Sequence, residues 1–153
     1  MFIKAENELF SEKDEIIENT KTMMDMVCNT DGLDMELGDK VTELNIIAEQ
    51  MQTAIAENSR TAIDQNEYER RYADLTERYN TIKSEYDKIS EQIESKKAQR
   101  ELFKGFIRAL EKQGALVEEF DEGLWNSLVQ EVVVKSKDDI LFIFKNGFKI
   151  KTR

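Results

Sequence analysis

The chain has 153 residues, enough for one domain or two small ones, and a formal net charge of −10. Charged residues make up 35% and apolar residues 40%, with no proline and six glycines, a composition typical of long helices. This acidity argues against a helical part that grips nucleic acid, because phosphate binding needs clustered lysine and arginine. One cysteine and no histidine exclude a disulfide framework and a zinc site built from this chain alone.

The first predicted element is a helix over residues 2–27. Apolar residues recur along it with helical spacing, at Ile3, Phe10, Ile17 and Met24. Further apolar neighbours make this stripe wider than a coiled-coil seam, so we expect the helix to pack on a globular base. The turn-forming run 28–32 then ends it. Cys28 in that run is either a small buried residue, the interpretation we favour, or a reactive thiol.

Two heptad ladders predict a long antiparallel coiled-coil hairpin. One lies on a helix from residue 33 or 34 to about 58, the other on a helix from about 66 to 113, with Gly114 as its stop. The link between them is too short for a parallel return, so the chain folds back on itself. An intermolecular dimer of straight helices is the alternative. The ladders are Leu37, Val41, Leu44, Ala48, Met51 and Ile55, and Tyr68, Tyr72, Leu75, Tyr79, Ile82, Tyr86, Ile89 and Ile93.

The last 33 residues predict a small β element. Asp121 can cap a short helix at 121–130, and three strands follow at about 131–135, 140–145 and 148–151, with a turn at 137–139 between the first two. Asn146-Gly147 is a strong hairpin signal, so the strands should form an antiparallel meander. Phe142 and Phe144 would share one face and Leu141 and Ile143 the other, so both faces need cover, from the base helices or from a part of the protein outside this chain.

Together these elements predict a mainly α fold with a small β element. A coiled-coil arm at 33–95, with its tip near 58–68, would emerge from a small α+β base made of residues 1–32 and 96–153. No apolar run could span a bilayer and no signal peptide opens the chain, so we expect a soluble, cytoplasmic protein with no membrane partner.

The sequence predicts protein contacts rather than catalysis. The chain has no histidine, which is the commonest general base in enzymes. Its glycines form no phosphate-binding loop, and its carboxylates fall on solvated helix faces. We therefore expect no enzyme activity and no cofactor. Tyr68 and Tyr72 begin the second ladder, where the partner helix ends. Either their hydroxyl groups reach water at the edge of the seam, or the two tyrosines contact another protein. In the tip, Ile63 has no certain internal site and either belongs to a capped turn or forms a contact patch.

Several stretches resemble the large serine recombinases of phages and transposons. Residues 58–75 resemble the tip region of that family's coiled coil. Residues 119–129, with the Phe-Asp-Glu…Leu-Trp…Leu-Val element, and the strand run ending in Phe144-Lys-Asn-Gly147 are similar to the end of its zinc-ribbon domain. Residues 2–9 are similar to the helix that follows the zinc ligands. The likeness covers nearly the whole chain.

The resemblance implies a bacterial or phage-encoded fragment without the catalytic domain and the zinc cysteines, so zinc is expected only with those upstream cysteines. It implies that the arm contacts another recombinase subunit during synapsis and controls directionality, with a recombination directionality factor as a further partner. Ala62, Ile63, Tyr68 and Tyr72 are then the contact residues. DNA would be bound by the full-length protein.

Two other functions fit the sequence. One is a structural or chaperone-like coiled-coil protein unrelated to DNA. The other is direct DNA binding by the base, which depends on the net charge of +3 over residues 131–153. Lys145, Lys149 and Lys151 would then contact phosphates.

Overall fold

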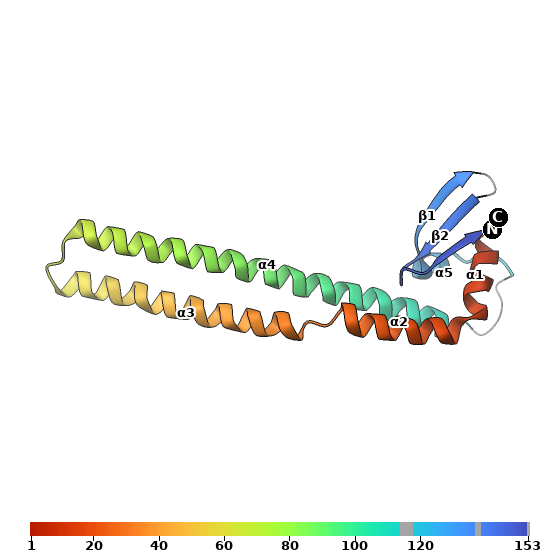
Figure 1. Ribbon diagram of the computed structural model, residues 1–153, viewed down its shortest axis with the longest axis horizontal. Coiled ribbons are helices and arrows are strands. Elements are labelled where there is room, and N and C mark those ends of the chain that lie inside the picture. Colours follow the sequence, from red (N-terminus) through yellow and green to blue (C-terminus); the bar gives the residue numbers. More distant parts are fainter. Residues whose placement is uncertain (114–117, 137–138, 153) are drawn as a thin grey trace. The chain divides into compact units, whose positions relative to one another are not determined.

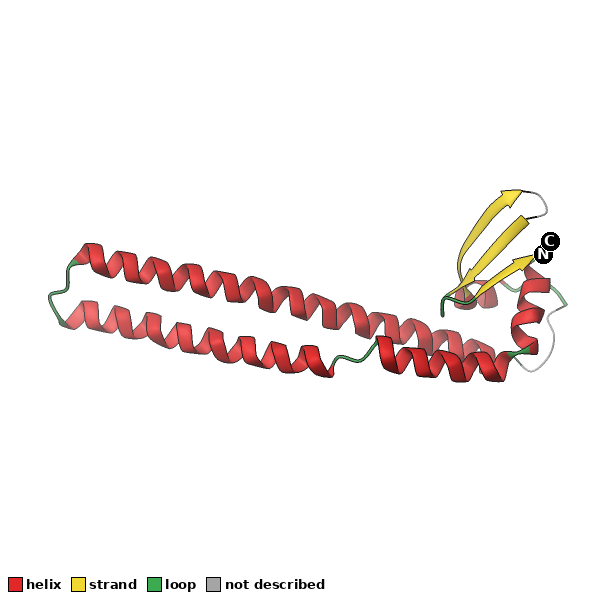
Figure 2. Ribbon diagram, viewed as in Figure 1, coloured by secondary structure: helices red, strands yellow, loops and turns green. Residues whose placement is uncertain are grey.

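The computed structural model describes residues 1–113, 118–136 and 139–152. It contains five helices and one three-stranded sheet within these residues (Figures 1 and 2). The chain divides into two compact units, one made of Met1–Asn29 with Lys96–Arg153 and the other of Thr30–Ser95. The elements are α1 (Phe2–Ser11), α2 (Lys13–Val27), α3 (Asp31–Arg60), α4 (Gln65–Lys112), α5 (Glu122–Leu128), β1 (Val129–Ser136), β2 (Asp139–Phe144) and β3 (Lys149–Thr152).

The unit Thr30–Ser95 is the predicted antiparallel hairpin. The helix α3 spans 30 residues, and the first part of the 48-residue α4 lies antiparallel beside it (Figure 2). Lys40 Nζ lies 2.8 Å from a carboxylate oxygen of Glu85, and Arg71 lies 3.0 Å from Glu57, so ion pairs join the two helices at both ends. The structure confirms a mainly helical fold with a long helix and a C-terminal antiparallel sheet.

The predicted ladder on α4 is confirmed as the seam. All eight of its positions from Tyr68 to Ile93 are buried or half-buried, and Leu75 and Ile93 are the most enclosed. The tyrosines stay half-buried, because a phenol at a seam edge can bury its ring while its hydroxyl reaches water.

The predicted ladder on α3 is wrong at two of its six positions. Leu37, Leu44, Ala48 and Met51 are half-buried as expected, but Val41 and Ile55 remain 43% and 47% exposed. The facing positions are one residue earlier, so the seam runs through Leu33, Leu37, Lys40, Leu44, Ile47, Met51 and Ala54. The reason is that α3 has apolar residues on both sides of its seam. Either ladder therefore satisfies heptad spacing, and only the packing of α4 decides between them.

The single N-terminal helix predicted over 2–27 is also wrong. The helix breaks at Glu12, whose φ of −115° and ψ of 19° are not helical, and α1 and α2 result. No glycine or proline marks this break. It lets Phe2, Ala5 and Leu9 of α1 join the core beside the sheet, while Ile16 and Ile17 of α2 pack with the end of α4. One straight helix could not bury both sets.

The sheet has the order β1-β2-β3, with both pairs antiparallel. Its inner face carries Phe142, Phe144 and Ile150, all buried, whereas Leu141 and Ile143 on the other face are only half-buried. One core joins the inner face to the helices of this unit. It consists of Phe2, Ala5, Leu9, Ile16, Ile17, Phe106, Ile107, Leu110, Leu128, Val129, Phe142, Phe144 and Ile150.

Local signals in the C-terminal segment are mostly confirmed. Asp121 caps α5 by accepting a hydrogen bond from the Leu124 backbone N–H at 2.9 Å, and the strands lie within two residues of their predicted bounds. In the hairpin turn only Gly147 has positive φ, at 86°, and its N–H donates to the Phe144 carbonyl. The turn is therefore centred one residue earlier than Asn146-Gly147, as in a three-residue loop with glycine in the left-handed position. The predicted stop at Gly114 and two residues of the 137–139 turn lie outside the described residues.

Candidate protein-interaction site

A four-residue loop, 61–64, joins α3 to α4, and local polar contacts hold it. The side chain of Asp64 accepts a hydrogen bond from the Asn66 backbone N–H at 2.8 Å and so caps α4. The Gln65 amide donates to Asn58 Oδ1 at 2.9 Å and to the carbonyl of Ile63 at 3.2 Å, which ties both helix ends to the loop. This tip therefore presents its side chains on an ordered backbone.

Two of the predicted contact residues form a pair. The ring centroids of Tyr68 and Tyr72 are 5.9 Å apart with an interplanar angle of 31°, and both rings are half-buried. Ile63 in the loop is also half-buried, and Ala62 is exposed. The tip thus offers two aromatic rings and one branched aliphatic side chain, partly open to solvent, within the ten residues from Ile63 to Tyr72.

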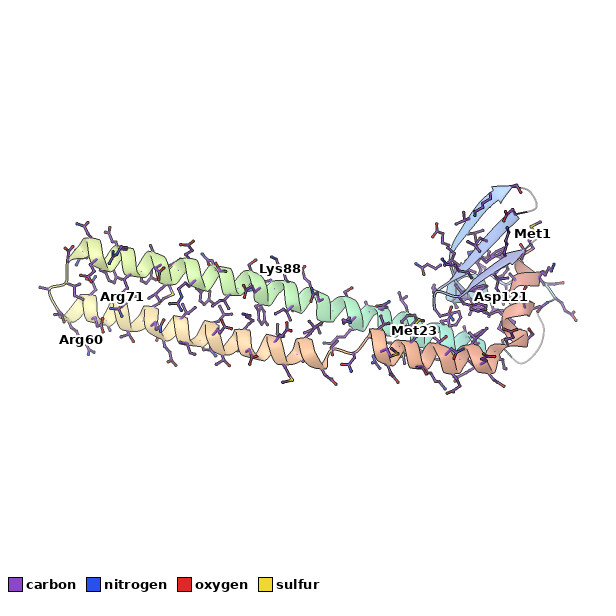
Figure 3. The ribbon with its side chains drawn as sticks, in the orientation of Figure 1. Met1, Met23, Arg60, Arg71, Lys88 and Asp121 are labelled. Atoms are coloured by element: carbon purple, nitrogen blue, oxygen red, sulfur yellow. The ribbon has the colours of Figure 1, made fainter. Side chains whose placement is uncertain are left out.

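Charged side chains stand beside these residues. Arg71 pairs with Glu57 across the two helices, and Arg60 ends α3 as an exposed residue; Figure 3 marks both arginines near the loop. An exposed ion pair contributes little to stability, at most about 1 kcal/mol. It does add polar atoms around the tyrosines, and a polar rim around aromatic anchors is the usual composition of a protein interface.

The three lysines proposed for DNA lie at the β2–β3 hairpin. Lys145 in the turn donates to the backbone carbonyl of Asn126, and Lys151 lies 3.0 Å from the carboxylate of Asp139. Lys149 is exposed on the same strand as Lys151. Two of the three positive charges therefore already have partners within the protein, which weakens the expectation that they bind phosphate.

No family model, curated protein or solved structure matches the chain. Over residues 1–113, 118–136 and 139–152, no helix is long and apolar enough to cross a membrane. Across the same ranges, no three cysteine or carboxylate side chains are grouped as metal ligands would be.

Sequence reasoning missed one ionisable group. Glu6 is fully buried on the inner side of α1, and neither of its carboxylate oxygens has a hydrogen-bond partner. Burial, together with the nearby negative charge of Asp121, raises the pKa of Glu6 from 4.5 to about 7. Its spacing from Phe2 and Leu9 could have revealed it, because Glu6 falls inside the apolar stripe of the helix. Cys28 is buried, as the favoured interpretation requires.

Proposed function

We propose that this chain is a non-catalytic protein-interaction module of a site-specific DNA recombinase. Its helical hairpin contacts a second recombinase subunit through the tip, with Ala62, Ile63, Tyr68 and Tyr72 at the contact. The single observation that carries the proposal is the tip itself, where an aromatic pair and Ile63 lie partly open on a backbone braced by Gln65. The resemblance of residues 58–75 to the coiled-coil tips of recombinases supports the assignment of the module to a recombinase.

The chemistry of the tip suits a contact that must form and break. Tyrosine rings give large contact area at low cost in side-chain entropy, and anchors of this kind dominate binding energy. The patch is small, so the interface belongs to the weak class that buries less than about 1,200 Å². A weak contact can be redirected by a directionality factor, because a modest difference in affinity between two states is enough to change their populations.

The test is sedimentation velocity on the wild-type chain and on an Ile63→Glu/Tyr68→Glu variant. The substitutions place two charges in the patch, so the tip contact should be lost while far-UV circular dichroism stays the same. A matched control is Met35→Glu/Ile46→Glu, which adds the same charges at exposed apolar positions of α3 away from the tip. Equal self-association of all three proteins would refute the tip contact.

The assignment to a recombinase has its own test. The reading frame upstream of the Met1 codon should encode a serine-recombinase catalytic domain and the zinc-ligand cysteines. A different upstream sequence would refute the assignment to a recombinase and would not affect the proposed tip contact.

One observation favours a second candidate, a structural or chaperone-like coiled-coil protein unrelated to DNA. Residues 1–60 carry 14 acidic against 5 basic side chains, and Lys145 and Lys151 are already paired. Such a protein would suppress the aggregation of an unfolded client, and it would give no mobility shift with duplex DNA even at low salt. A shift that weakens steeply with salt would instead support DNA binding by the base.

A further inference from the structure

The helix α3 carries a second heptad ladder that is uncharged and exposed. It follows the same alternating steps of three and four as the seam, but lies about 100° away around the helix axis. Between Gly38 and Ser59 no charged residue of α3 falls on this ladder, and the next step before Gly38 is Asp34. Six of its seven members are exposed and Ala48 is half-buried. The edge ladder consists of Gly38, Val41, Asn45, Ala48, Gln52, Ile55 and Ser59.

The residue types of the edge ladder are symmetric about its central residue, Ala48. Residues the same number of ladder steps before and after Ala48 are of the same kind. If a second copy of α3 lies antiparallel across it, with a two-fold axis at Ala48, like residues face each other. The facing pairs are Ala48 with Ala48, Asn45 with Gln52, Val41 with Ile55, and Gly38 with Ser59.

The helix α4 bears a matching ladder on the same edge of the hairpin. It is centred on Thr76, and the same two-fold operation brings Ala73 opposite Asn80 and Glu69 opposite Lys83, which also pairs with Asp87 of its own helix. An open hollow of about 730 Å³ beside this ladder is lined by Ala73, Thr76 and Asn80 together with charged side chains that include Glu77, Glu85 and Lys88.

One axis serves both ladders. Lys40 pairs with Glu85 and Asn58 contacts Gln65, and this register places Ala48 and Thr76 at about the same level along the hairpin. The seam and the edge ladder are about a quarter turn apart on α3, which is the angle between the two neighbours of each helix in a four-helix bundle.

We propose that this edge of the hairpin is an interface between two copies of the chain, which pack as an antiparallel four-helix bundle about a two-fold axis at Ala48 and Thr76. Two-fold interfaces are the commonest in soluble oligomers and require a self-complementary surface, which the two ladders supply. The facing amides of Asn45 and Gln52 would fix the register, as single polar residues do in coiled coils.

The opposite edge of the hairpin does not offer this surface. Glu57 and Arg71 form an ion pair there, and Lys40 contacts both Glu43 and Glu85 near it. Binding of an unrelated helix would not require a symmetric order of residue types, so the symmetry of the edge ladder favours a second copy of the chain as the partner.

The proposed edge contact is independent of the tip contact, and the experiment separates them. All proteins carry the Ile63→Glu/Tyr68→Glu tip substitutions, so any association that remains comes from elsewhere. Sedimentation equilibrium up to about 1 mM should show a dimer, and Val41→Glu/Ile55→Glu should weaken it by roughly 100-fold or more. The matched control is Met35→Glu/Ile46→Glu, since Ile46 is 51% exposed on another face of α3. It should leave the dimer intact.

A cysteine pair tests the register. With Cys28 replaced by serine, a mixture of Val41→Cys and Ile55→Cys chains should form a disulfide-linked heterodimer under mild oxidation, whereas Val41→Cys alone should not cross-link. Helicity measured by circular dichroism shows that each variant is folded. A tip-substituted protein that stays monomeric, a dimer indifferent to Val41→Glu/Ile55→Glu, or efficient cross-linking of Val41→Cys to itself would each overturn the proposal. None of these results would bear on the tip contact.

Discussion

Removal of the buried carboxylate at Glu6 should abolish a pH dependence of stability in the unit that contains the sheet. The side chain is fully buried without a hydrogen-bond partner, and the pKa of its carboxyl is raised from 4.5 to about 7. In the unfolded chain the carboxyl titrates near its ordinary value. The folded protein therefore holds an extra proton between these two pH values, so its stability falls as the pH rises through that window.

The size of the effect follows from the pKa difference. A shift from 4.5 to about 7 corresponds to about 3 kcal/mol over the whole window. Most of it, about 2 to 3 kcal/mol, is lost between pH 5 and pH 8. Glu6→Gln cannot ionise, so its free energy of unfolding should lack this decrease and should exceed that of the wild type at pH 8.

Urea unfolding followed by tryptophan fluorescence measures this quantity. Trp125 is the only tryptophan, and its ring lies 4.7 Å from that of Phe2 on α1, so it reports on this unit. The matched control is Glu8→Gln, which removes the same charge from an exposed position of α1. Parallel pH profiles for wild type and Glu6→Gln would show that the folded protein holds Glu6 ionised, and the reasoning would fail.

Further outcomes are expected from substitutions elsewhere in the chain. Asp121→Asn keeps an acceptor for the Leu124 N–H but removes the charge that raises the pKa of Glu6, so the wild-type decrease in stability should end at a lower pH in the same urea titration. Gly147→Ala should cost about 1 kcal/mol, because φ is 86° there, whereas Gly105→Ala inside α4 should gain up to about 1 kcal/mol; chemical denaturation measures both. Lys40→Leu places an apolar residue at a seam position, and thermal melts should show a hairpin at least as stable as the wild type. A double-mutant cycle on Glu57 and Arg71 should give a coupling energy below about 1 kcal/mol, because both side chains are about half exposed.

The sequence predicted the elements whose signals are local. The seam of α4 was predictable because its eight positions are filled by tyrosine, leucine and isoleucine without a competing ladder. The cap at Asp121 and the hairpin at Gly147 were predictable because each depends on one residue type with a specific backbone role. The loop at 61–64 followed from the gap between two ladders, and with it the place of the candidate contact residues.

Other features were fixed only by packing between distant segments. The choice between Val41 and Lys40 as a seam residue needed the partner helix, since heptad spacing allows both. No glycine or proline marks the break at Glu12 in the sequence. The helices α1 and α2 are separate because their apolar residues pack into different parts of one core. Glu6 falls inside the apolar stripe of α1, but its complete burial is seen only in the folded unit.

The sequence by itself therefore determined that this is a helical hairpin protein with a small C-terminal sheet, because periodicity and turn chemistry are properties of neighbouring residues. The tertiary structure decided which face of α3 meets α4 and which is left open, since apolar area is buried only when a partner is present. That decision left the expected seam residues Val41 and Ile55 exposed, on either side of a half-buried Ala48, on the edge that we propose as an interface.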